Sequence, residues 1–233
     1  MPTFDHGRST KVWGDGWDLS AYLRTATAPY NAGELDTTTY GNNGEKSFQK
    51  DNSDSTISLG GFWRDTVTEP VETILNAASV ITIAPAGAVL NNPARLAYVF
   101  GTKTETPSDA GDLIQQSADY RARGGVGRGR LIRVPGSPVS AGGNGTSTDF
   151  SAASLNYWSA SLHLLAIDAG TFTGTLQHSA DNTTWVSAGV FTALTAKGGA
   201  YLSGSGRLER YRRIIWTFAG GTSADFVASL ASA

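Results

Sequence analysis

Three residues in the stretch LQHSADNTTWVSAG, residues 176–189, carry groups that could do chemistry. His178, Ser179 and Asp181 supply an imidazole, a hydroxyl and a carboxylate, the groups of a nucleophilic hydrolase. Successive side chains of a strand point to opposite faces, however, so His178 and Ser179 do not meet easily. The following ADNT favours a turn, because Asp and Asn bond their own backbone and tolerate left-handed angles. We therefore predict a hairpin turn here and no catalytic site.

The rest of the chain offers no other catalytic, metal or cofactor motif. No G-x-S-x-G elbow exposes a nucleophile, the three histidines lack metal-ligand spacing, and there is no cysteine. The glycine cluster GGVGRG, residues 124–129, misses the spacing of a dinucleotide-binding loop. Asp51, Asn52 and Asp54 lack the glycine and the terminal glutamate of a calcium loop. We expect a protein without an enzyme activity, a metal or a cofactor.

Five arginines lie within thirteen residues of the chain: Arg121, Arg123, Arg128, Arg130 and Arg133. One interpretation is a surface that binds phosphates or nucleic acid. The other is a hairpin around the glycine cluster whose polar face meets acidic groups of a neighbouring subunit. No aromatic residues alternate with these arginines to stack on bases, and the net charge of −2 gives no general nucleic-acid signature. The second interpretation is favoured.

The elements around these residues are expected to be strands. The chain has 28 glycines and only 16% charged residues, a composition that suits few helices. The exception is TEPVETILNAA, Thr68–Ala78, with a proline in its first turn and an apolar stripe at helical spacing. We predict an all-β protein, a β-sandwich or barrel, with this one helix on its outer side. Residues 40–55 are polar and rich in Asn, Gly and Ser, which predicts a long loop.

The expected strands fall on both sides of a break at residues 135–151, PGSPVSAGGNGTSTDFS, which reads as a surface linker. In the first part, residues 1–134, strands are expected at 56–63, 80–84, 95–102, 112–123 and 130–134. In the second part, residues 152–233, they are expected at 157–167, 172–178, 185–191, 212–218 and 225–230. A second basic run, with Arg207, Arg210, Arg212 and Arg213, suggests the edge of a sheet.

Neither a targeting segment nor a membrane segment is expected. The opening MPTFDHGRSTKVW lacks the apolar centre of a signal peptide, and no run approaches the roughly 20 apolar residues that span a bilayer. We expect a soluble protein without a membrane anchor, made in a cytoplasm. The six tryptophans fall within or beside expected strands, which favours core packing over stacking on sugar rings.

The first seventy residues resemble the major tail, or tail tube, proteins of long-tailed bacteriophages. DLSAYL is followed by LDTTTYGNNGEKSFQKDNSDSTISLGGFWRD, and in that family an Asp-Thr-Thr-x-[Tyr/Phe]-Gly segment precedes a polar loop and a strand. The matching positions are Asp36, Thr37, Thr38, Tyr40, Gly41, Gly60, Gly61, Phe62, Trp63 and Asp65. LQHSADNTTW, RYRRIIWTF and FVAS are similar to the second part of related phage tail proteins, so that the resemblance touches about two thirds of the chain.

The resemblance implies a virion protein, assembled in the host bacterial cytoplasm, whose hexameric rings stack into a hollow tail tube for genome delivery. The implied partners are other copies of the chain, the tape measure and tail terminator proteins, and DNA in passage without sequence-specific binding. Two alternatives stay open. They are a capsid decoration protein and a carbohydrate-binding module.

The expected contacts between subunits lie in the polar loop and in the arginine cluster. A ring can use exposed strand edges to close a continuous sheet, and a loop of this length is unusual between two strands. The candidate interface residues are Tyr40, Gly41, Asn42, Asn43, Gly44, Glu45, Lys46, Ser47, Phe48, Gln49, Lys50, Asp51, Arg121, Arg123, Arg128 and Arg130.

Overall fold

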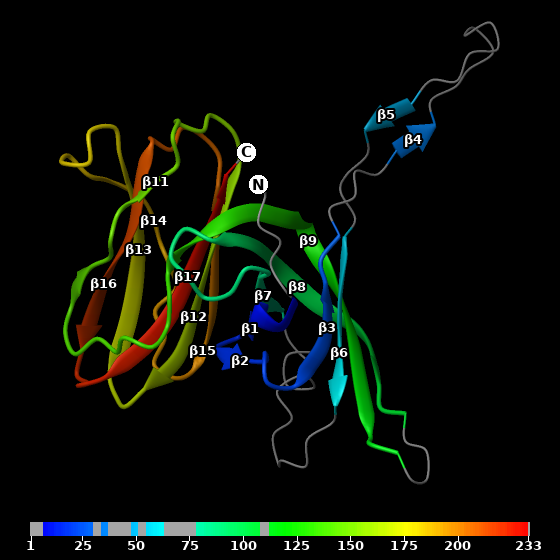
Figure 1. Ribbon diagram of the computed structural model, residues 1–233. Coiled ribbons are helices and arrows are strands. Elements are labelled where there is room, and N and C mark those ends of the chain that lie inside the picture. The colour runs from blue at the N-terminus through cyan, green and yellow to red at the C-terminus, as the bar shows by residue number, and fades with distance from the viewer. Residues whose placement is uncertain are drawn as a thin grey trace, which may run out of the picture.

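The computed structural model describes residues 7–29, 34–36, 48–50, 55–62, 78–107 and 112–232, which fold almost entirely into strands (Figure 1). Within those ranges the helical structure is one short 3-10 turn, η1, Gly7–Ser9. The all-β expectation is therefore confirmed. The helix expected at Thr68–Ala78 lies outside the described residues, apart from Ala78 at its end.

The larger sheet is antiparallel and has ten strands in the described part of the chain. They are β1 (Lys11–Gly14), β2 (Trp17–Asp18), β3 (Leu23–Thr27), β6 (Thr56–Phe62), β7 (Ser79–Ala84), β8 (Pro93–Glu105), β9 (Gln115–Arg133), β12 (Trp158–Ile167), β15 (Gly198–Gly204) and β17 (Ala224–Ser232). Their order is β15-β12-β17-β9-β8-β7-β1-β2, with β6 beside β9 and β3 beside β6. The nineteen-residue β9 pairs with β6 along its first half, with β17 near its end, and with β8 along most of its length.

The smaller sheet has five strands in the described residues: β10 (Gly143–Asn144), β11 (Thr148–Asp149), β13 (Thr171–Ser179), β14 (Val186–Val190) and β16 (Tyr211–Ala219). Figure 1 shows this sheet packed against β12, β15 and β17, which makes a sandwich. Phe226 of β17 lies between the two layers, with its ring centroid 4.7 Å from that of Phe172 and 5.2 Å from that of Trp216. Buried aromatic contacts of this kind hold the sandwich together.

A second core lies under the first half of the larger sheet. There β7 is buried along all six residues of its apolar sequence SVITIA, and Ile57, Leu59 and Tyr120 from β6 and β9 pack against the same cluster. Ile57 and Leu59 face this core because side chains two residues apart share one face of a strand. The alternation of apolar and polar residues that predicts this strand therefore also determines which of its faces is buried.

The strands β4 (Glu34–Asp36) and β5 (Phe48–Lys50) form a separate two-stranded ribbon. This ribbon projects away from both sheets in Figure 1. Residues 40–55 were expected to form a loop, and the structure corrects this at Phe48–Lys50, which pairs with Glu34–Asp36 in antiparallel register. The three-residue strand is too short and too polar to show a periodic pattern in the sequence.

Two further expectations about strands are wrong. The ranges 112–123 and 130–134 were expected to be two strands around a glycine turn, but β9 runs through both without a hairpin. Gly124 and Gly125 have φ angles of 77° and 83°, which changes the strand's register without reversing its direction. Of the second basic run, Arg212 and Arg213 lie on β16, which is interior to its sheet, between β13 and the short strands β10 and β11, and Arg207 and Arg210 precede it.

Residues 135–151 contain two short strands, where the sequence indicated a linker. Gly143–Asn144 and Thr148–Asp149 both pair with β16, and Val139 bridges to Ala224. The larger sheet joins strands from the two expected parts of the chain, since β17 pairs with both β9 and β12. The division at residues 134 and 152 into separate parts stays a prediction.

Candidate assembly surface

The segment around His178 is a hairpin turn between β13 and β14, as predicted. Asp181 organises the turn: its Oδ1 accepts hydrogen bonds from the backbone N–H groups of Thr183 (2.9 Å) and Thr184 (2.7 Å) and from the Ser179 hydroxyl (2.8 Å). These bonds, led by those from the backbone, lower the pKa of Asp181. His178 faces elsewhere, and its Nδ1 accepts from the backbone N–H of Glu209 at 3.2 Å. The three groups do not form a hydrolytic triad.

Four strands of the larger sheet extend together and form what we call the arm sheet: β3, β6, the first half of β9 and the second half of β8. The register places residues directly opposite one another across all four strands. One such row is Thr27, Ser58, Asp119 and Lys103, and the next is Thr25, Gly60, Ser117 and Glu105. The arm sheet is therefore a regular four-stranded surface.

The two faces of the arm sheet differ in chemistry. One face carries Ile57, Leu59 and Tyr120 into the core. The other carries the two rows described above, which are hydroxyl-rich and contain both signs of charge. On that face the Ser58 hydroxyl donates to Asp119 Oδ1 at 2.6 Å, and Lys103 pairs with Glu105 at 2.6 Å. A sheet with one solvated face of this kind is typical of antiparallel structure.

Both outer edges of the arm sheet are open within the described residues. There β3 pairs with β6 alone, and β8 has β9 as its only partner from Phe100 to Glu105, because its pairing with β7 ends at Val99. Unpaired strand edges carry rows of free N–H and C=O groups and are templates for pairing with another chain. The two edges lie on opposite sides of one sheet, so a second copy could add at each.

The candidate interface residues of the polar loop are placed only in part. Phe48, Gln49 and Lys50 form β5, whose partners in register are Asp36, Leu35 and Glu34. The other positions, Tyr40 to Ser47 and Asp51, lie outside the described residues. Their role in assembly stays a prediction.

The four candidate interface arginines separate into two groups along β9. Arg121 and Arg123 point to the polar face of the arm sheet, and the Arg123 guanidinium lies 5.8 Å and 5.6 Å from the ring centroids of Tyr98 and Phe100. Beyond the two glycines, Arg128 and Arg130 lie where the larger sheet meets the smaller one. The aromatic partners that the sequence did not show next to these arginines come from neighbouring strands, a pairing that only the strand order reveals.

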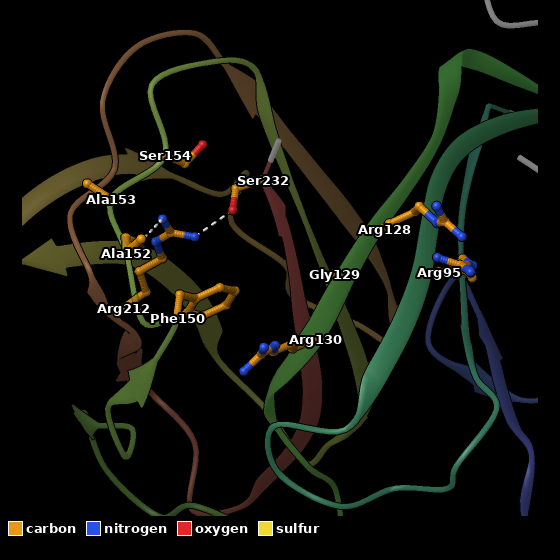
Figure 2. Close-up of a pocket in the computed structure, with 10 residues that line it drawn as sticks. All are labelled: Arg95, Arg128, Gly129, Arg130, Phe150, Ala152, Ala153, Ser154, Arg212 and Ser232. Carbon is orange, nitrogen blue, oxygen red and sulfur yellow. Dashed lines mark hydrogen bonds between the residues drawn. The ribbon is translucent and has the colours of Figure 1, made fainter. Parts of the chain in front are cut away.

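Arg128 and Arg130 line a cavity of about 380 Å³, which we call the arginine pocket. Its lining residues are Arg95, Arg128, Gly129, Arg130, Phe150, Ala152, Ala153, Ser154, Arg212 and Ser232. Figure 2 shows Arg95 and Arg128 next to each other, and Phe150 with Arg212 on one side and Arg130 on the other. Arg95 and Arg212 were not among the candidate site residues, because they are far in sequence from the cluster on β9.

Metal and membrane features are absent from the part of the chain that the structure describes. No group of three or more His, Asp or Glu side chains is placed to hold a metal ion there. No helix in the same ranges has the length and apolar character needed to cross a membrane.

No protein-family model and no curated protein matches the chain. Among solved structures it is similar to a chain of the virion of a native gene transfer agent particle, with 15% identity over 53% of this chain and 97% of that one and a TM-score of 0.41. It is also similar to the Dit protein of phage SPP1 (11% identity, 94% and 98% of the two chains, TM-score 0.37). A third likeness is to a chain of the phage p2 baseplate, with 10% identity over 94% of this chain and 97% of that one and a TM-score of 0.33. All three have low TM-scores, so function must be inferred from the chain's own strands and edges.

Proposed function

We propose that the chain is a non-enzymatic structural subunit of a phage tail that assembles into rings, and that these rings stack into the tail tube. The observation that carries this proposal is the arm sheet with two open edges and one polar face. The resemblance of LDTTTYGNNGEKSFQKDNSDSTISLGGFWRD to tail tube proteins agrees with it. Hexameric symmetry is taken from that resemblance.

Ring closure in this proposal uses the two open edges of the arm sheet. If β3 of one copy pairs with the free half of β8 in the next, each arm sheet continues into its neighbour and both of its open edges are used. Closed sheets remove the exposed edges that otherwise promote aggregation. The hydroxyl-rich face would line a hydrophilic channel, while the apolar face stays in the core of each subunit. DNA could pass along such a face without a sequence-specific site.

Engineered disulfides test this pairing directly, because the natural chain contains no cysteine. We would place one cysteine on β3, as Thr25→Cys or Thr27→Cys, and one on β8, as Lys103→Cys or Glu105→Cys, in all four combinations. Within one copy these positions are separated by three strand spacings, about 14 Å, and a disulfide spans at most about 7 Å between Cα atoms. Any bond that forms must therefore join two copies.

The expected result under oxidation is a ladder of linked copies in at least one combination, ending at the number of subunits in the ring. The matched control combines Thr27→Cys with Val190→Cys, which lies on the exposed strand β14 of the smaller sheet. A control that cross-links as well as the test pairs, or four test pairs that stay monomeric while electron microscopy shows tubes, would rule out edge pairing between β3 and β8.

The remaining parts of the proposal concern partners. Tape measure and tail terminator proteins would meet the inside and the end of the tube. Negative-stain electron microscopy of the purified protein checks the central claim, since long hollow filaments are expected. A capsid decoration protein would instead bind empty shells and form no filament.

A further inference from the structure

Another cavity, of about 750 Å³, lies between the part of β9 around Gly124 and the paired strands β12 and β15. We call it the tyrosine pocket, because Tyr157 and Tyr201 line it from two different segments of the chain. Its volume is within the range of about 300–1,000 Å³ that is usual for small-molecule sites. The pocket therefore has room for a ligand much larger than a single ion.

One wall of the tyrosine pocket combines serine hydroxyls with aromatic rings. Ser159 of β12 and Ser203 of β15 are direct partners in the register. Tyr201 lies two residues before Ser203, so these three side chains share one face of the strand pair. Tyr157, which directly precedes β12, lines the same cavity. Because a hydroxyl group both donates and accepts hydrogen bonds, this wall offers polar contacts of both kinds beside the rings.

Tyr201 is held in place by its neighbours. Its ring stacks on that of Tyr98, with centroids 5.5 Å apart and an angle of 21° between the planes. Burial raises the pKa of the Tyr201 hydroxyl, and a hydrogen bond with Ser159 opposes this shift. A ring that is fixed in this way loses little conformational entropy when a ligand binds.

Tyr157 lies at the surface, with 78% of its area exposed. The adjacent Trp158 is different, because it packs into the core of the sandwich and lies against Gly204, where there is no room for a Cβ. The tyrosines, and not the tryptophan, therefore present aromatic surface to a ligand. A large exposed aromatic side chain beside a cavity is typical of a recognition site.

The opposite wall is formed by main chain. Three residues of β9, 124–126, lie opposite the single Ala97 of β8, which makes a bulge. Gly124 and Gly125 have positive φ angles and line the cavity, and a Cβ at Gly124 would meet no other atom within 4 Å. Bulges of this kind are frequent next to functional sites. The glycines keep the space in front of the serine and tyrosine wall open.

We propose that the tyrosine pocket binds a short oligosaccharide. A pyranose ring has an apolar face of C–H groups and a rim of hydroxyl groups, which matches aromatic rings bordered by serine hydroxyls. Arg123 also lines the cavity, and its guanidinium can donate to a sugar hydroxyl or to the carboxylate of an acidic sugar. This site goes beyond the structural role proposed above and does not depend on it.

A glycan array probed with the full chain tests the proposal, and the retained saccharides are then titrated by calorimetry. Tyr157→Ala should weaken their binding about tenfold. It should leave the melting temperature unchanged, because the side chain is exposed. The matched control is Leu155→Ala, which removes an apolar side chain that is 68% exposed, lies two residues away and does not line the cavity. This control should leave the affinity unchanged.

Gly124→Asn tests the opposite wall by filling the open space. Asparagine tolerates a positive φ, and a side chain at this position meets no neighbour near its Cβ. The variant should therefore melt within a few degrees of the natural chain and still bind the retained saccharides more weakly. An array that retains no saccharide, or affinities that are equal in the natural chain, Tyr157→Ala and Gly124→Asn, overturns the proposal.

Arg123→Gln separates neutral from acidic saccharides. An acidic sugar whose carboxylate meets Arg123 should bind this variant about tenfold more weakly, whereas the affinity for a neutral sugar should change less. A six-nucleotide single strand is the competing ligand, because bases also stack on aromatic rings. If this oligonucleotide binds more tightly than every saccharide on the array and loses affinity in Tyr157→Ala, the pocket belongs to nucleic acid and the proposal is wrong.

Discussion

His163 on β12 lies fully buried and begins a chain of polar groups through the core. The backbone N–H of Gly16 points at its Nδ1 at 3.5 Å, so the ring proton sits on Nε2 and is donated to the Thr82 hydroxyl at 2.8 Å. The chain continues to Ser161 at 2.7 Å and Ser229 at 2.6 Å. It joins β7 to β12 and β17, and every member is satisfied, as a buried network requires.

This burial makes stability depend on pH. Burial lowers the pKa of His163 from 6.5 to about 3. Between those values the unfolded chain binds a proton that the folded chain does not, so stability falls as pH drops below about 6.5, by about 1.4 kcal/mol per pH unit at most. Urea unfolding from pH 7 to pH 5 should show a steeper loss of stability in the natural chain than in His163→Gln.

Above pH 5 the carboxylates whose pKa is lowered in the fold contribute little, and Asp15, whose pKa is raised by burial, acts in the opposite direction because it stabilises the fold as pH falls. The lowered pKa values of Asp149, Asp168 and Asp181 affect stability only as pH falls through the unfolded value of 3.8. His178, whose pKa is also lowered by burial, contributes in the same window as His163, so His178→Gln serves as the control. An unchanged slope in His163→Gln would show that another group is responsible.

A second prediction at this scale concerns the turn at Asp181. Asp181→Ala removes the acceptor for two backbone N–H groups and should lower the melting temperature by a few degrees. Asp181→Asn keeps an oxygen acceptor and should lose less. If esterase activity were present in the natural chain and absent from Asp181→Ala, the interpretation of this segment as a simple turn would be wrong.

Among the elements, two strands with regular apolar patterns were predicted to within one residue at each end. The expected 172–178 is β13, Thr171–Ser179, and the expected 212–218 is β16, Tyr211–Ala219. The strand β15, Gly198–Gly204, was missed because GGAYLSG has no apolar alternation and three glycines. It is held by pairing with β12, a tertiary contact that local propensity does not encode.

The glycines of β9 make a prediction about that strand. A Cβ at Gly129 would overlap the Leu230 carbonyl and lie 2.6 Å from Ala231 Cα, so β17 can approach β9 only when this position is glycine. Gly129→Ala should therefore destabilise the fold by several kcal/mol, on the order of 3, or prevent folding. Gly124→Ala is the control: a Cβ meets nothing within 4 Å there, and only the positive φ is strained, which costs about 1 kcal/mol.

Denaturant unfolding of both variants measures this difference. Equal losses for Gly129→Ala and Gly124→Ala would mean that β17 can move away from β9 at little cost, and that the close approach is not required.

For the whole molecule, the sequence predicts where many strands lie along the chain, but it does not predict which strand edges remain unpaired in the folded sheet. That the edges of β3 and β8 are free depends on the strand order, which joins residues as far apart as Gly129 and Ala231. The arginine pocket is hidden for the same reason: Arg95 and Arg212 line one cavity only because the strand order brings β8, β9 and β16 together. The cluster on β9 was visible in the sequence, and the other half of the site was not.

The projecting ribbon gives a prediction at this scale. Replacing residues 34–50 by a short Gly-Ser connection removes β4 and β5, which pair with each other, and leaves the two cores described above in place. The shortened chain should melt near the temperature of the natural one. If the ribbon and the polar segment within it join one ring to the next, the variant should form rings but no long tubes in electron microscopy.

Tubes of normal length from this variant would place the contacts between rings elsewhere. A matched control replaces the hairpin turn at residues 180–184 with a Gly-Ser connection, which shortens a different loop and should leave the tubes unaffected.

The position of β17 has a consequence for the order in which the chain can mature on the ribosome. Ala224–Ser232 is made after the other strands of the larger sheet, yet it lies inside that sheet, between β9 and β12. A nascent chain that has not reached Ala224 cannot join these two strands, and it exposes two long strand edges during synthesis. Such edges attract other unfinished chains. Chaperone dependence should therefore be greatest after β12 has been made and before Ala224–Ser232 follows, and a chain arrested before Ala224 should be protease-sensitive along β12.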